Sequence, residues 1–213
     1  MNNREKNQDI KVILYDADGV VVNAYMLFSK LLDQKYGISL ETTQGFFKGP
    51  FVDCLNGTKD MREILPSYLK EWGWEGTLDD FLDFWFSSEH SIEKSIIDHI
   101  DILRKNGIKC YVATNQEKHR AKYILEDMGF NDHFDGLFAS SHLGVRKPNI
   151  EFFKKVLVKV DAKPEEVLFW DDTKENIDAA RSLGLHAEHF TSVEKYMELM
   201  KQYGIDYATG NRS

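Results

Sequence analysis

The second half of the chain alternates between short apolar stretches and amphipathic segments of about a dozen residues. The apolar stretches lie at 108–115, 134–140, 166–172 and 186–190, and segments with helical apolar spacing separate and follow them. An earlier apolar stretch at 11–17 has the same character. Buried strands that alternate with helices predict a parallel sheet covered on both faces, because each parallel crossover needs a connection about as long as a helix.

A long segment of helical character interrupts this alternation after the first strand. Residues 24–37 carry apolar residues at helical spacing, and Thr77 with its acidic first turn predicts a helix over 77–90. Between them, the glycine-punctuated segment 45–57 reads as a loop. The predicted fold class is therefore α/β: a Rossmann-like parallel sheet with helices on both faces, plus an inserted small all-α domain.

Length and composition bound the organisation and partners of the chain. Its 213 residues suit a core domain at 1–22 and 93–213 with an insertion at 23–92. The net charge of −8 is spread without a basic stripe, which disfavours nucleic acid partners. No run approaches the roughly 18 apolar residues of a membrane span, and the N-terminus lacks a signal-peptide pattern. Cys54 and Cys110 show no disulfide or metal-ligand spacing. We expect a cytoplasmic protein that is a monomer by default.

Polar residues stand at the carboxyl ends of the predicted strands, where open parallel sheets place their ligands. They are Asp16 and Asp18 after the first strand, Thr114 and Asn115 after the second, Lys147 after the third, and Asp171 and Asp172 at the fourth. Converging carboxylates repel each other by about 4 kcal/mol per pair at about 4 Å and an effective dielectric near 20. An oxygen-only set without histidine or cysteine favours Mg²⁺ as the neutralising cation. A metal, a lysine and a hydroxyl donor together suit a phosphoryl group, whose transfer depends on positioning and charge neutralisation.

Four short motifs occur in a fixed order along the chain, and together they resemble the haloacid dehalogenase superfamily of phosphohydrolases. "DADGV" resembles the nucleophile motif, "VATN" the second motif, the lysine of "RKPN" the third, and "WDDTKEN" the acidic fourth. The resemblance covers essentially the whole chain. It places the helical segment 23–92 in the position of the type I cap of this superfamily.

The resemblance implies a role for each of these residues. Asp16 would be the nucleophile that forms an aspartyl-phosphate, and Asp18 the general acid and base. Asp16, the main-chain carbonyl of Asp18, and the fourth-motif acids would hold Mg²⁺, with Asp172 the better aligned ligand and Asp171 supporting. Thr114, Asn115 and neighbouring amides would bind the phosphoryl oxygens, and Lys147 would hold both nucleophile and phosphate. An aspartate at position 18 favours a phosphatase, since dehalogenases of this superfamily carry another residue there.

Two residues depart from the usual pattern of the superfamily, and several others have simpler interpretations. Asn23 and Asn176 stand where many relatives have acids. Thr114 could instead cap the following helix, and Lys147 could be a surface lysine. The aromatic residues of the insertion could include a sugar-stacking wall, but their spacing favours a hydrophobic core; they are Phe46, Phe47, Phe51, Trp72, Trp74, Phe84 and Trp85.

The leading hypothesis from the sequence is a Mg²⁺-dependent phosphatase of a small phosphorylated metabolite, with sugar phosphates as the example the resemblance suggests. A mobile cap would exclude bulk water and choose the substrate. One alternative is a phosphomutase of the same superfamily, similar to β-phosphoglucomutase, which also keeps both aspartates of the first motif. The other alternative, from a different functional class, is a catalytically silent binding or regulatory protein on the same fold.

Overall fold

The computed structural model describes residues 9–23 and 28–205, and their central feature is a parallel sheet of five strands. The strands stand in the order β3-β2-β1-β4-β5, which confirms the predicted fold class. They are β1 Val12–Tyr15, β2 Lys109–Thr114, β3 Gly136–Ala139, β4 Val167–Asp171 and β5 His186–His189. Because β1 pairs with β2 on one side and β4 on the other, the residues that end these three strands meet at one edge.

Helices cover both faces of the sheet, and the alternation of side chains along the strands assigns each face its core. One face is covered by α6 Lys94–Lys105, α7 Lys118–Glu126, α8 Phe130–His133 and α12 Val193–Gln202. The other is covered by α10 Ile150–Val160 and α11 Lys174–Ser182. Ile13 and Tyr15 of β1 point into the first core, and Val12 and Leu14 into the second.

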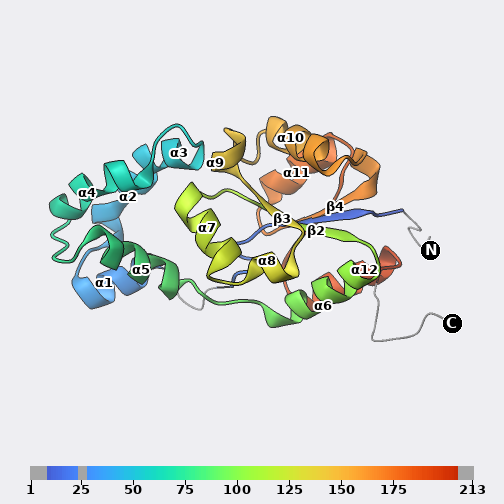
Figure 1. The fold of residues 1–213 in the computed structure, drawn as a ribbon, viewed down its shortest axis with the longest axis horizontal. Helices are drawn as coiled ribbons and strands as arrows, with labels where there is room; N and C mark the ends of the chain where they lie inside the picture. Colours follow the sequence, from blue (N-terminus) through green and yellow to red (C-terminus); the bar gives the residue numbers. More distant parts are fainter. Residues whose placement is uncertain (1–8, 24–27, 206–213) are drawn as a thin grey trace.

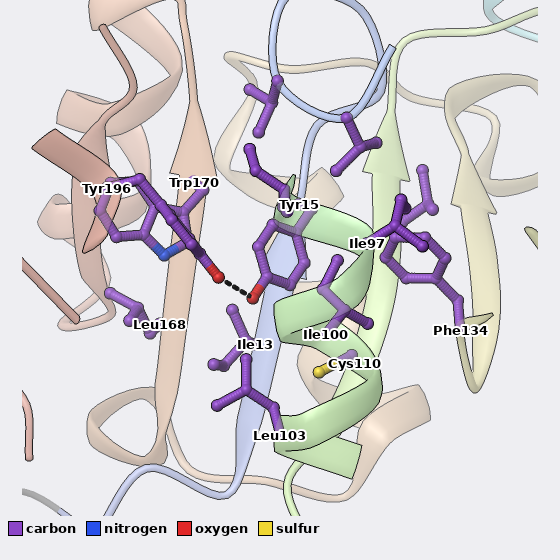
Figure 2. Close-up of a cluster of buried hydrophobic side chains, with 14 of the residues drawn as sticks. Ile13, Tyr15, Ile97, Ile100, Leu103, Cys110, Phe134, Leu168, Trp170 and Tyr196 are labelled. Atoms are coloured by element: carbon purple, nitrogen blue, oxygen red, sulfur yellow. Dashed lines mark hydrogen bonds between the residues drawn. The ribbon is translucent and has the colours of Figure 1, made fainter. Parts of the chain in front are cut away.

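The first of these cores contains a polar pair that is completely buried. Figure 2 shows Tyr15 of β1 among the apolar side chains of α6, with its hydroxyl 3.0 Å from the hydroxyl of Tyr196 on α12. Tyr196 also lies 2.8 Å from Nδ1 of His99, so each hydroxyl in the apolar core has a partner. This pair ties the last helix to the central strand just before that strand reaches Asp16.

Five of the six described helices between β1 and β2 form a separate lobe, which we call the cap (Figure 1). They are α1 Phe28–Tyr36, α2 Leu40–Phe47, α3 Pro50–Leu55, α4 Met61–Glu71 and α5 Leu78–Ser88. The cap has its own hydrophobic cluster, in which Phe46, Trp72 and Trp85 are buried and the other four aromatic residues named above are partly buried. The structure therefore assigns these aromatics to the cap core. No described helix of the chain is long and apolar enough to cross a membrane.

The predicted helix starts in the cap agree with the structure in part. Thr77 begins α5 through a capping box, in which its hydroxyl accepts from the Asp80 amide at 3.1 Å and Asp80 accepts from the Thr77 amide at 2.8 Å. The helix expected over 24–37 is described from Phe28 onward, and residues 24–27 lie outside the described residues.

The prediction of a loop over 45–57 is wrong, because α2 and α3 occupy most of it. Ser39 caps α2 by accepting a hydrogen bond from the Thr42 amide, and Pro50 stands in the first turn of α3, where its missing N–H costs nothing. Gly45 lies inside α2 beside Phe46, which is 1% exposed. Burial of such apolar residues in the cap core outweighs the low helix propensity of glycine, which sequence reading took as a break.

Two contacts between the cap and the core domain lie close together in the sequence. Asp60, the N-cap of α4, accepts from Lys118 Nζ and His119 Nε2 of α7, both at 2.7 Å. Gly57, with φ +69°, lies so close to the Ser141 carbonyl oxygen that a Cβ on it would come within 2.1 Å. Only glycine allows this approach between the end of α3 and the short helix α9 Ser140–Leu143.

We expect Gly57→Ala to lower the free energy of unfolding by more than about 2 kcal/mol, because the left-handed φ alone costs alanine about 1–2 kcal/mol and the clash with the Ser141 carbonyl oxygen adds to it. Chemical denaturation with intrinsic fluorescence measures the change. Gly37→Ala is the matched control: its φ is +68°, and a Cβ there meets nothing within 4 Å. If the two variants lost equal stability, the close approach of Gly57 to Ser141 would contribute nothing.

Candidate active site

Lys147 lies at the centre of the polar residues that the strands bring together. Its Nζ is 2.6 Å from Asp171 Oδ2 and 3.0 Å from Asp16 Oδ2, and the residue is 2% exposed. The interpretation of Lys147 as a surface lysine is therefore wrong. Burial alone lowers the pKa of Lys147, but the carboxylates of Asp16 and Asp171 outweigh this and hold its pKa above the usual value. The lysine is a fixed positive charge beside the end of β1.

Asp16 follows β1 directly and is almost completely buried. Its Oδ1 accepts a hydrogen bond from the Ala17 amide at 2.7 Å, so the carboxylate is held on both oxygens, by this amide and by Lys147. Burial raises the pKa of Asp16, the Asp171 charge adds to the rise, and Lys147 opposes it. Because the pKa of Asp16 is raised beside other acids, a cation bound nearby would favour its charged form.

The two adjacent acids at the end of β4 have different environments. Asp171 is fully buried and accepts from Lys147, from Nδ2 of Asn176 at 3.0 Å on each oxygen, and from the Thr173 amide at 2.8 Å. Asp172 is exposed to the cavity described below. One oxygen from each of Asp16, Asp171 and Asp172 lies within 4.8 Å of the others. Asp172 accepts a hydrogen bond from the Thr173 hydroxyl on Oδ1 at 3.3 Å, whereas both oxygens of Asp171 are engaged by several donors.

Asp18 stands two residues beyond Asp16. It is followed by a turn that requires glycine at position 19. Gly19 has φ +80°, and a Cβ on it would lie 2.2 Å from Asp172 Oδ2, so the first motif and the fourth are in direct contact here. Gln116 Nε2 donates to Asp18 Oδ2 at 2.5 Å. Removal of the carboxyl from bulk water raises the pKa of Asp18, although the residue still exposes surface to the cavity, and Arg120 and Lys147 oppose the rise.

Thr114 is the last residue of β2 and Asn115 follows it, beside these acids. Thr114 is buried, and the side-chain cap of α7 is Glu117, so Thr114 does not cap this helix. Asn115 clamps the loop that carries Lys147: its Oδ1 accepts from the Lys147 amide at 2.8 Å and its Nδ2 donates to the Lys147 carbonyl at 3.0 Å. The side chain of Asn115 therefore positions the lysine.

One cavity of about 520 Å³ joins these residues. Asp16, Asp18, Thr114, Asn115 and Asp172 all line it. The two departures from the superfamily pattern line it too, Asn23 near the start of the cap and Asn176 on α11. None of the seven cap aromatics named in the sequence analysis is among the described residues that line this cavity, which gives no support to a sugar-stacking wall.

Three residues near the cavity were missed by sequence reasoning. Gln116 orients Asp18, Glu89 at the end of α5 lines the cavity, and Arg120 of α7 is buried beside Glu89. A signal existed for Gln116, which follows the second motif on the same strand-end loop. No local signal marked Glu89 or Arg120, because the packing of the cap against α7 brings them to the site.

The fold and the cavity define an α/β protein whose polar residues gather at the point where the strand order reverses, on either side of β1. A family model of haloacid dehalogenase-like hydrolases matches residues 10–184. The chain therefore belongs to the haloacid dehalogenase-like hydrolases, with its cap inserted between β1 and β2.

Curated relatives of this chain include phosphatases. A sesquiterpene phosphatase of Aspergillus oryzae is 37% identical over 107 residues, which cover 48% of this chain and 53% of that protein. The chain thus spans only about half of this relative, and less of the next relatives in similarity. A phosphorylated carbohydrates phosphatase of Thermotoga maritima is 20% identical over 190 residues, covering 83% of this chain and 82% of that one.

A solved structure from Bacteroides thetaiotaomicron has the same fold. It is a magnesium complex of an enzyme of the haloacid dehalogenase family, with a TM-score of 0.77 and 22% identity. The similarity covers 91% of this chain and all of that chain. It extends across both the sheet and the inserted helices, since neither lobe alone accounts for that share of the residues.

Proposed function

We propose that this protein is a Mg²⁺-dependent phosphatase that hydrolyses a small phosphorylated metabolite through an aspartyl-phosphate on Asp16. The observation that carries the proposal is the placement of Lys147 between Asp16 and Asp171, with Asp18 and Asp172 opening on the same cavity. A nucleophile, a proton donor, a buried cation and the exposed carboxylate of Asp172 are thereby gathered within one site. The magnesium complex of the Bacteroides relative supports the choice of metal.

The donor set fits a magnesium ion. Asp16 and Asp172 offer carboxylate oxygens, the main-chain carbonyl of Asp18 is a further donor in the proposal, and Asp171 supports the site through its hydrogen bonds to Lys147, Asn176 and the Thr173 amide. The single charge of Lys147 leaves excess negative charge among Asp16, Asp171 and Asp172, which a hard divalent cation would offset. When bound, Mg²⁺ would neutralise charge on the phosphoryl oxygens and lower the repulsion between phosphate and carboxylates.

The protein groups would act in two displacements. In the first, a carboxylate oxygen of Asp16 bonds to phosphorus as the bond to the ester oxygen breaks, and Asp18 protonates the departing alcohol. In the second, Asp18 removes a proton from water as it attacks phosphorus, which releases inorganic phosphate and restores Asp16. Thr114 would donate to a phosphoryl oxygen, and Lys147 would keep Asp16 ionised and oriented.

The polar lining of the cavity favours a polar substrate. Apart from Val22 and Gly19, the described lining residues carry polar or charged side chains. This suits a sugar phosphate or another hydroxyl-rich ester, in line with the Thermotoga relative named for phosphorylated carbohydrates. An apolar leaving group such as a sesquiterpene, the class in the name of the Aspergillus relative, would leave these side chains without partners.

The proposal also covers the domain boundaries, the cellular setting and the oligomeric state. We place the boundary of the cap at residues 23–92 and the core at 1–22 and 93–213; Asn23 N–Ser91 O and Glu93 N–Val21 O hydrogen bonds, both 2.9 Å, lie at this double crossing. Both cysteines are free and buried, and burial raises the pKa of both thiols, which suits a reducing cytoplasmic setting. A monomer is the proposed state.

We expect the protein to release phosphate from p-nitrophenyl phosphate and from hexose phosphates when Mg²⁺ is present, and to lose at least about 100-fold of this rate in EDTA. A malachite-green phosphate assay, with Mg²⁺ added back to the EDTA sample as the control, measures both. Product analysis by ³¹P NMR separates the alternatives: transfer of phosphate within a sugar would indicate a phosphomutase. No turnover of any ester, with Mg²⁺ bound, would overturn the proposal in favour of a silent binding protein.

A further inference from the structure

Among the described residues, Glu89 is the one at the end of a cap helix that lines the cavity. It is the C-cap of α5, and its side chain is 21% exposed. The other described lining residues come from the strand ends of the core domain, the start of α11, and the first crossing into the cap at Val22 and Asn23. Glu89 therefore stands on the side of the cavity away from the sheet, where the leaving group of a phosphate ester on Asp16 would lie.

The carboxylate of Glu89 is held in place from several directions. Trp85 Nε1 donates to its Oε2 at 3.1 Å and the Phe28 amide to its Oε1 at 3.4 Å. Arg120, which is 2% exposed, places a guanidinium nitrogen 3.8 Å from Oε2 and donates to the carbonyls of Phe86 at 3.0 Å and Glu89 at 3.4 Å. A carboxylate fixed in this way presents a charge at a set position.

The charged side chains that line the cavity are all negative among the described residues. Four carboxylates line it, those of Asp16, Asp18, Asp172 and Glu89, and no lysine or arginine does so among the described residues. Lys147 lies beneath Asp16 and Asp171, and Arg120 is occupied by the end of α5. Residues 24–27, which lie outside the described residues, are Ala-Tyr-Met-Leu in the sequence and add no charge.

Glu89 and Asp18 are close enough to influence each other. Burial raises the pKa of Glu89, and the negative charge of Asp18 adds to this rise, whereas Arg120 opposes it. A second anion brought into the cavity that both acids line would be repelled by each of them. An ammonium or hydroxyl group in that place would instead find acceptors.

We infer that Glu89 is a specificity-determining residue that selects phosphate esters by the charge of their leaving group. Esters whose leaving group carries hydroxyl or ammonium groups are accepted, and those with a second anion, such as a carboxylate or another phosphate, are rejected. The inference rests on the proposed phosphatase function, which supplies the phosphoryl site at Asp16. It goes beyond that function by naming the residue and the charge that it discriminates against.

A set of three esters of nearly equal size tests this selection. They are 2-hydroxyethyl phosphate, phosphoethanolamine and 2-phosphoglycolate, whose two-carbon leaving groups end in a hydroxyl, an ammonium and a carboxylate. We expect wild-type kcat/KM for phosphoglycolate to be at least about tenfold below that of the other two, as like charges in a partly solvated cavity imply. In Glu89→Gln the ratio of kcat/KM for phosphoglycolate to that for 2-hydroxyethyl phosphate should rise about tenfold.

The ratio separates selection by charge from a purely structural role. Loss of the contacts to Trp85 and Phe28 would lower all three kcat/KM values together and leave the ratio unchanged, which would overturn the inference. Glu71→Gln, the same change at an exposed position of α4 outside the cavity lining, is the matched control and should leave the ratio at the wild-type value. An equal rise in the ratio for Glu71→Gln would also contradict the inference.

The affinity of the three esters provides a second test of the selection, and this test does not depend on turnover. Calorimetry with Asp16→Asn at saturating Mg²⁺ should rank the Kd values of the three esters in the same order. Glu89→Gln in that background should reduce the difference in Kd between phosphoglycolate and the other two esters. If p-nitrophenyl phosphate and all three esters were left intact by the wild-type protein while this ranking held, the proposed hydrolysis would fail and selection by Glu89 would stand. Equal binding of the three esters would overturn the selection itself.

Discussion

Asp16→Asn is expected to abolish phosphate release, with kcat reduced by at least about 10⁴-fold on every ester. The amide has almost the same shape as the carboxylate, but it lacks the charge that attacks phosphorus and attracts a metal ion. Lys147 keeps its 2.6 Å contact with Asp171 in this variant, so the lysine is not left unpaired. Steady-state assays at saturating Mg²⁺, combined with a search for phosphate on the protein by intact mass spectrometry after acid quench, measure the loss.

The same substitution should keep the fold and raise the stability of the metal-free protein. The pKa of Asp16 is raised by burial, so the folded state binds the proton more tightly than the unfolded chain does. Stability is therefore lost as the pH rises through the range between the unfolded and the folded pKa, and Asn removes this loss. Thermal melts in EDTA at pH 5 and pH 8 should show a gain for Asp16→Asn mainly at pH 8.

Asp178→Asn, the same change at an exposed position of α11, is the matched control and should alter neither turnover nor the melts. Retained hydrolysis in Asp16→Asn would remove Asp16 from the nucleophile role. A variant that fails to fold would contradict the argument from shape and charge.

Asp18→Asn is expected to lower turnover of alkyl phosphates by about 10²–10⁴-fold, and to affect p-nitrophenyl phosphate much less. An alkoxide is a poor leaving group and needs a proton as the ester bond breaks, whereas p-nitrophenolate leaves without one. The raised pKa of Asp18 favours the protonated form that this step requires. Asn at position 18 can still accept the hydrogen bond from Gln116, so its position is preserved.

The dependence on leaving group is the diagnostic measurement for Asp18. Rates for a series of aryl and alkyl phosphates should show a steeper dependence on leaving-group basicity in Asp18→Asn than in wild type. An equal loss across the whole series would assign Asp18 a role in holding the site together. Single-turnover measurements check that the chemical step, and not product release, is being compared.

The order of strands and helices could be predicted from the sequence because the relevant signals are local. Apolar stretches such as 11–17 and 166–172, set between segments of helical spacing, already specify a parallel sheet and place Asp16 and Asp171 at strand ends. The loop prediction at 45–57 was wrong because the deciding interaction there is not local. There the local signals were glycines, and the burial of Phe46 in the cap core, which is not local, decided for helix.

By itself, then, the sequence determined the fold class and the set of side chains that stand at the ends of β1, β2 and β4. Only the tertiary structure decided the different environments of those side chains. Asp171 is hydrogen-bonded by Lys147 and Asn176, whereas Asp172 faces the cavity. It also brought Glu89 and Asp18 to the same cavity, although 71 positions separate them in the sequence. The physical reason is that strand and helix periodicity is encoded within a few residues, whereas the charge around a site depends on which distant segments pack against it.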